Sequence, residues 1–191
     1  RTVTVTPATG QSGTATITVT VSDGTATASS AFVLTVNGSG PVGLVAAWSF
    51  NAGSGTTLAD VSGNGNTGAI QGATWTTAAQ GKYGSALSFN GTSNLVAINA
   101  SASLNVSSAM TLEAWIYPTA SQSGWRTVMQ REVDACFLNA SNDSGPLLPS
   151  GGGTLGGNVS IIRGPTASPV NAWTHVAVTY DGSMLRLYVN G

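Results

Sequence analysis

Apolar and polar side chains alternate along several short segments of this chain, and this period of two restricts the fold more than any other feature. Small apolar residues alternate with threonine in residues 14–21, and a similar alternation covers residues 110–117 and 173–180. Successive side chains of a β-strand point to opposite faces of its sheet, so each of these segments is suited to bury one face. We therefore expect a chain built from short antiparallel strands.

Turn signals separate these segments. Asp23-Gly24 and Asp181-Gly182 are two-residue hairpin signals, and Asn90-Gly91 is a third turn of the same type. The abundance of Gly and Pro in residues 142–157 predicts a long, mobile loop there. Many short strands and almost no helix predict an all-β fold, an antiparallel two-sheet jelly-roll sandwich.

The composition limits the partners that this chain can have. Its charged fraction is 7%, far below the roughly 25% of an average soluble domain. The net charge of −1 gives no electrostatic reason to expect nucleic acid as a partner, and no apolar run is long enough for membrane insertion. The lone Cys136 cannot form an internal disulfide. A disulfide-free β-protein of this kind fits a bacterial secreted or cell-surface protein.

The pattern also predicts a division into domains. The segments Thr14–Asp23 and Phe32–Val36 resemble the end of a bacterial immunoglobulin-like or cadherin-like repeat, so we expect residues 1–37 to be the C-terminal part of such a repeat. Gly and Pro mark residues 38–43 as a linker. Residues 44–191 then form a second domain, which we expect to be incomplete because the sequence stops at a turn signal.

Residues 60–68, of sequence DVSGNGNTG, carry the most specific chemical signal in the chain. Asp60, Ser62 and Asn64 lie at alternate positions and Gly65 follows them, which matches the beginning of a calcium-binding loop. Calcium prefers such a set of carboxylate, hydroxyl and amide oxygens. The alternative, a surface loop that binds nothing, is also compatible with these residues.

Two other readings of the same loop are excluded by its surroundings. An EF-hand would need Glu at position 71, where the chain has Gln71, and helices on both sides. Gly63, Gly65 and Gly68 match the glycine spacing of a dinucleotide-binding fingerprint, but residues 69–72 predict a short strand and a turn where that site needs a helix.

The residues that could carry catalysis lack their partners. Glycosidases with a jelly-roll fold use a strand motif of the type E-x-D-x-x-E, and Glu132 and Asp134 match its first two positions, but Phe137 occupies the third. We therefore expect these two carboxylates to lie on a solvated strand face. His175 is the only histidine, and we expect it to pack beside Trp173. The sequence thus predicts that this chain is not an enzyme.

Aromatic residues in the loops are candidates for carbohydrate binding, because an aromatic face can stack on the apolar face of a sugar ring. Trp125, next to Arg126 in a Ser/Gln/Gly segment, is the preferred candidate. Tyr83 and Trp75 are further candidates, together with Tyr117. Three other tryptophans lie in alternating segments and are predicted to pack in the core: Trp48, Trp115 and Trp173.

The second domain resembles the LamG-like, concanavalin A-like jelly-roll modules of bacterial secreted proteins. The resemblance rests on five motifs in order: AWSF at 47–50, the 60–68 loop, GSALSFNG at 84–91, Thr111–Pro118, and the segment from Trp173 to Gly191. It implies a non-catalytic domain that binds sugars or protein ligands, often with a structural calcium ion. It also implies that oxygens of the 60–68 loop bind this calcium, which adds Asn66 to the predicted ligands. The family's acidic residues after Phe89 correspond here to Asn90 and Asn94.

These observations together predict a binding module of a large extracellular protein. Its expected partner is a polysaccharide, a glycan or a surface protein, with calcium as the expected cofactor. Two other classes of function are compatible with the same sequence. One is a structural spacer without a ligand, and the other is an accessory domain of a carbohydrate-active enzyme whose catalytic domain lies outside this chain.

Overall fold

A computed structural model describes most of the chain: residues 4–6, 13–36, 43–106, 108–121, 123–132, 134–142 and 148–191. Its strands are paired in antiparallel sheets, which confirms the prediction of an all-β fold. The contacts divide the chain into two compact units. The first consists of Arg1–Ala79 and Gly84–Leu104, and the second of Gln80–Tyr83 and Asn105–Gly191. The predicted linker lies largely outside the described residues, and the predicted domain boundaries remain predictions.

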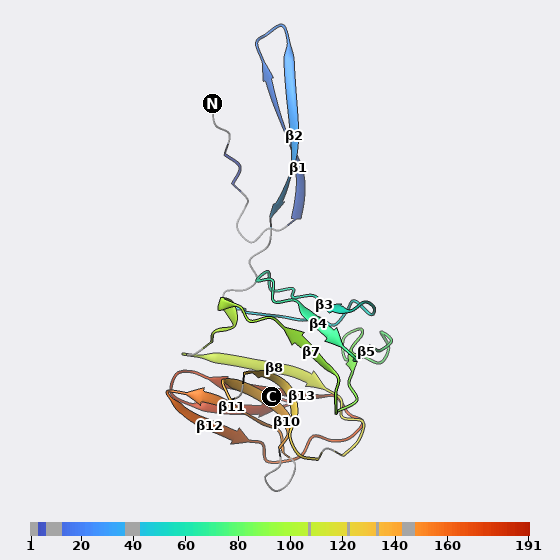
Figure 1. Cartoon of the computed structure of the whole chain (residues 1–191), viewed down its shortest axis with the longest axis vertical. Helices are drawn as coiled ribbons and strands as arrows, with labels where there is room; N and C mark the ends of the chain where they lie inside the picture. Colours follow the sequence, from blue (N-terminus) through green and yellow to red (C-terminus); the bar gives the residue numbers. More distant parts are fainter. Residues whose placement is uncertain are drawn as a thin grey trace. The chain divides into compact units, whose positions relative to one another are not determined.

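The N-terminal part of the first unit contains the predicted hairpin. Strand β1 (Gly13–Ser22) pairs with β2 (Thr27–Val36) as a long ribbon (Figure 1). The Asp23 carboxylate accepts hydrogen bonds from the backbone N–H groups of Thr25 and Ala26, at 2.9 and 2.7 Å. Gly24 has a φ of 94°, which a residue without Cβ adopts easily. The Asp-Gly pair therefore forms the turn that its sequence predicts, while the membership of this hairpin in an immunoglobulin-like repeat stays a prediction.

The rest of the first unit holds two small sheets. One has the order β3-β4-β7, and the other pairs β5 with β6. The bounds of these strands are β3 Thr57–Leu58, β4 Gly68–Gln71, β5 Thr74–Trp75, β6 Leu87–Ser88 and β7 Leu95–Ile98. A short 3₁₀ helix, η1 (Ala102–Leu104), follows β7. The 60–68 loop connects β3 to β4, so a sheet holds both of its ends.

The second unit is a two-layered sandwich (Figure 1). One sheet has the order β14-β13-β8 and the other the order β12-β11-β10-β9. Their strands are β8 Met110–Ile116, β9 Arg126–Arg131, β10 Cys136–Ser141, β11 Ser150–Leu155, β12 Asn158–Arg163, β13 Thr174–Tyr180 and β14 Leu185–Val189. Leu138 of one sheet packs with Val176 and Val178 of the other, and all three are fully buried. The core of this unit thus lies between its two sheets, as the alternation in β8 and β13 predicts.

The prediction of a long loop at 142–157 is wrong for its second half, because residues 150–155 form strand β11. Three consecutive glycines, Gly151 to Gly153, occupy the middle of this buried strand. A Cβ atom on Gly151 would lie 2.6 Å from Cβ of Val178 in the facing sheet. Glycine in a strand often marks a close approach by another part of the chain, and here it permits the contact between the sheets. Residues 143–147 of the predicted loop lie outside the described residues.

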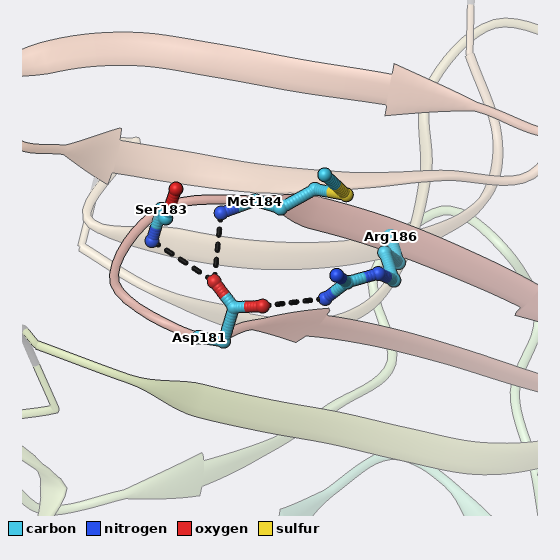
Figure 2. A network of polar contacts seen from close by, with 4 residues as sticks. All are labelled: Asp181, Ser183, Met184 and Arg186. Carbon is cyan, nitrogen blue, oxygen red and sulfur yellow. Dashed lines mark hydrogen bonds and ion pairs between the residues drawn. The ribbon is translucent and has the colours of Figure 1, made fainter.

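The Asp181-Gly182 turn joins β13 to β14, as predicted. Figure 2 shows the Asp181 carboxylate between the backbone N–H groups of Ser183 and Met184 and the guanidinium of Arg186. The hydrogen bond from Arg186, at 2.6 Å, and those from Met184 and Ser183 lower the pKa of Asp181 to about 2. The turn is therefore held by an ionised carboxylate.

This lowered pKa predicts how the contribution of Asp181 to stability depends on pH. Because the folded state holds the proton less tightly than the unfolded chain, the stabilisation is present above about pH 4 and is lost as pH falls towards 2. We expect the difference in melting temperature between the wild type and Asp181→Asn to be constant from pH 5 to about 7 and to shrink below about pH 4. Thermal melts of both proteins across this range measure it. A difference that is unchanged at the lowest pH would contradict the role of the ionised carboxylate.

Candidate functional site

The 60–68 loop is organised around the carboxylate of Asp60. Its Oδ1 accepts hydrogen bonds from the backbone N–H groups of Ala47 and Ser62, at 3.0 and 2.9 Å. Its Oδ2 accepts from the hydroxyl of Ser62 and the backbone N–H of Asn66, both at 2.8 Å. Partial burial works to raise the pKa of Asp60, but these four hydrogen bonds together lower it below its usual value. Asp60 is thus held as a carboxylate by donors from three residues, two in its own loop and one in the segment before it.

The backbone of residues 44 and 45 is held by asparagine side chains of the same loop. Asn64 Nδ2 lies 2.9 Å from the carbonyl oxygens of both Leu44 and Val45, and Asn66 Nδ2 lies 3.0 Å from that of Val45. Asn66 is buried, with 3% of its surface exposed, and its Oδ1 accepts a hydrogen bond of 2.6 Å from the hydroxyl of Ser101. Because a carbonyl oxygen only accepts, the amide nitrogen of Asn66 must face Val45. The orientation of this side chain is therefore determined by its neighbours.

The structure brings the four predicted calcium ligands into one network, in which hydrogen-bond donors face the side-chain oxygens of Asp60, Ser62 and Asn66. Asp60, Ser62, Asn64 and Asn66 are connected by the contacts described above, and Ser62 and Asn66 are buried. An ionised carboxylate offers about four acceptor positions, and in Asp60 four donors already occupy them. Among the described residues, no three His, Cys, Asp or Glu side chains gather closely enough to hold a metal ion. Calcium at this loop remains a prediction from the sequence.

A second group of side chains lies on the outer face of the β14-β13-β8 sheet. The ring of Tyr83 meets that of Trp115 edge to face, with centroids 5.9 Å apart and an angle of 85° between the planes. The ammonium of Lys82 lies 4.4 Å from the centroid of Trp115, within the range of a cation–π contact. Tyr83 is 70% exposed and Trp115 37%. The predicted ligand-binding residue Tyr83 therefore belongs to an exposed aromatic cluster.

His175 extends this aromatic cluster, defined as Lys82, Tyr83, Trp115 and His175. His175 of β13 is directly opposite Trp115 of β8, and their ring centroids are 5.2 Å apart. Its Nε2 lies 3.6 Å from a carboxylate oxygen of Glu113. The prediction that His175 is packed is confirmed, but its partner is Trp115 and not Trp173.

The sequence prediction missed Trp115, which it assigned to the core. Leu112, Ala114 and Ile116 alternate with Trp115 along β8, and Leu112 and Ile116 pack in the core, so Trp115 must point outward. The alternation itself was the signal that could have found it. Trp173, just before β13, packs against Tyr117, just after β8, with ring centroids 5.4 Å apart.

The other predicted sugar-binding residues lie at separate positions along the chain. Trp125, 45% exposed, immediately precedes β9, and the guanidinium of Arg126 donates a hydrogen bond of 3.3 Å to the hydroxyl of Ser123. Trp75 belongs to β5 of the first unit, where its indole N–H donates to the carbonyl oxygen of Gly55 at 2.8 Å. Tyr83 is thus the predicted residue with the best-defined aromatic neighbours.

Glu132 and Asp134 do not lie on a strand face, contrary to the prediction. Both belong to the turn between β9 and β10, and both have a positive φ, of 48° and 62°. A strand places residues two apart on the same face, whereas Glu132 and Asp134 lie in the turn that joins the antiparallel strands β9 and β10. Phe137, at the third position of the hydrolase motif, is buried in β10.

Residues 90–191, more than half of the chain, match the family model of the laminin G type that is described as the concanavalin A-like lectin/glucanases superfamily. The chain belongs to this family. The resemblance of the second domain to concanavalin A-like modules is therefore confirmed, and the match covers β7, η1 and strands β8 to β14. The Asp60 loop precedes the matched residues. A comparison with curated proteins found no match.

Proposed function

We propose that this chain is a non-catalytic carbohydrate-binding module and that the aromatic cluster around Tyr83 and Trp115 is its contact surface. The observation that carries the proposal is the exposed ring of Tyr83, held edge to face against Trp115. A ring that is fixed by a neighbour can stack on the apolar face of a sugar with little loss of side-chain entropy. The family is one of carbohydrate- and ligand-binding domains in general, which supports a binding role.

The polar groups around these rings support a carbohydrate as the ligand. Lys82 supplies a donor, Glu113 an acceptor, and His175 has ring nitrogens that can do either. Sugar binding sites combine aromatic surface with a few polar groups that fix the orientation of the hydroxyls. Trp125 and Arg126 are proposed as a second contact, and Trp75 as a third, because of their residue types and positions in the sequence.

The absence of catalysis is part of the proposal. Glycoside hydrolysis needs two carboxyl groups on either side of the scissile bond. Glu132 and Asp134, the pair that most resembles a hydrolase motif, lie in a turn, and the third position is the buried Phe137. These observations support a role in binding alone.

A secreted or cell-surface location is proposed from the family to which the chain belongs. Laminin G-like domains are typically extracellular. In the described part of the chain, no helix has the length and apolar character needed to cross a membrane. The sequence motif of residues 60–68 is the only support for calcium as a cofactor, and the hydrogen bonds that occupy the Asp60 carboxylate count against it.

A glycan array with the full chain tests the proposed function. We expect selective binding to a carbohydrate, and a loss of affinity of about fivefold or more in Tyr83→Ala, because a stacked aromatic ring contributes on the order of 1 kcal/mol. The control is Phe89→Ala, which removes another exposed aromatic ring, 47% exposed, outside the cluster. Thermal melting verifies that both variants fold. A blank array from folded protein, or equal losses in both variants, would contradict the proposal and favour a protein ligand or a spacer.

A further inference from the structure

The Asp60 loop has properties that the calcium motif does not explain. A calcium site needs several oxygen atoms that converge on one point and are free to bind the ion. In this loop, the oxygens of Asp60 are surrounded by three backbone N–H groups and one hydroxyl. A metal ion bound by Asp60 would have to displace these donors, and two of them are backbone N–H groups of the loop itself.

The neighbouring oxygens are also covered by donors. The carbonyl oxygen of Val45 accepts hydrogen bonds from Asn64 Nδ2 at 2.9 Å and from Asn66 Nδ2 at 3.0 Å. The Oδ1 of Asn66 is occupied by the hydroxyls of Ser101 and Ser103. The sequence motif predicts calcium at this loop, but the oxygen atoms of Asp60, Val45 and Asn66 do not fit a calcium site. Each of them already accepts hydrogen bonds from the chain.

We propose that the Asp60 loop is a metal-independent clasp, in which the Asp60 carboxylate fastens residues 44–47 to the loop and Asn66 fastens the loop to residues 101–103. Residues 44–47 have no regular strand pairing of their own. They are held instead by hydrogen bonds from Ala47 N–H to Asp60, from Val61 N–H to the Ala47 carbonyl at 2.8 Å, and from the asparagine side chains. The clasp takes the place of the sheet ladder in this segment.

Trp48 adds a further contact between the same segment and the loop. Its indole N–H donates to the carbonyl oxygen of Asn66 at 2.9 Å, and its backbone forms an isolated bridge with Asp60. Trp48 is therefore anchored to Asn66 through its indole ring and to Asp60 through its backbone. Loss of the Asp60 carboxylate should loosen residues 44–48 as a whole.

Calcium titration of the full chain distinguishes the clasp from a metal site without any mutation. We expect the wild type to have the same melting temperature in calcium and in chelator, and no heat of binding in calorimetric titration with calcium chloride. Hydrogen exchange should show that the amides of Ala47, Ser62 and Asn66 are protected in both conditions. Calcium-dependent melting, or protection of these amides only in calcium, would overturn the proposal.

A conservative variant provides the second arm of the experiment. Asp60→Asn keeps the shape of the side chain but replaces one acceptor oxygen with an NH₂ group that faces N–H or O–H donors. We expect a melting temperature lower by about 5 °C or more, equally in calcium and in chelator, with loss of protection at Ala47 and Asn66. The matched control, Asp181→Asn, changes an exposed turn carboxylate and should leave these amides protected. A shift in Asp60→Asn that appears only in calcium would overturn the proposal.

Discussion

Gly152→Ala is expected to lower the free energy of unfolding by about 3 kcal/mol. Gly152 lies in the middle of β11, and a Cβ atom there would overlap the carbonyl oxygen of Ser160 on the neighbouring strand and lie 3.1 Å from Cα of Ile161. These are backbone atoms of the β11–β12 ladder, so they can move only if the pairing of the strands is disturbed. Urea denaturation of the full chain measures the change.

A matched glycine controls for the general effect of adding a methyl group. Gly164 is also buried, but its Cβ would lie 3.4 Å from Cδ2 of Leu187 and 3.5 Å from the carbonyl oxygen of Pro149, which are ordinary contacts. We expect Gly164→Ala to change the stability by less than about 1 kcal/mol. Equal stability of the two variants would show that β11 does not need glycine at position 152.

Asn66→Asp is expected to destabilise the first unit by about 3 kcal/mol at neutral pH. The substitution replaces the amide nitrogen that donates to Val45 and Ser103 with an oxygen, at a site that is 3% exposed. A buried carboxylate would then face the carbonyl oxygen of Val45 with no donor between them. Chemical denaturation, together with hydrogen exchange at residues of this unit, measures the effect.

Asn64→Asp is the matched control for this prediction. Asn64 donates to the same carbonyl oxygen of Val45, at 2.9 Å, but its side chain is exposed and a charge there remains in water. We expect its effect to be well below that of Asn66→Asp. Equal effects of the two substitutions would mean that the burial of Asn66 does not decide the stability of the loop.

Most strands of the sandwich could be predicted because their pattern is local. In Met110–Ile116 and Thr174–Tyr180 the apolar residues recur at every second position, and the structure buries that face. The turns at Asp23 and Asp181 were predictable for a similar reason, since each carboxylate accepts N–H groups only two and three residues away. A pattern of this kind needs no knowledge of the rest of the fold.

Strand β11 and the aromatic cluster could not be predicted in this way. Three consecutive glycines indicate a loop in any local pattern, and only the position of Val178 in the facing sheet explains why a strand needs them. Lys82 and Tyr83 meet Trp115 although some thirty residues of chain separate them. Their proximity depends on the path of the chain between them, which their own residue types do not encode.

The sequence by itself determined that this chain is all-β, where most strands and hairpin turns lie, and which family it resembles. Only the tertiary structure decided what Asp60 contacts and that Tyr83 lies against Trp115. The physical reason is the range of the interactions. Alternation and turn chemistry act within a few residues, whereas Asp60 and Asn66 also have partners outside their loop, in residues 45–47 and 101–103. A sequence motif can identify the oxygen atoms of a loop, but the tertiary structure determines whether those oxygens already accept hydrogen bonds from the chain.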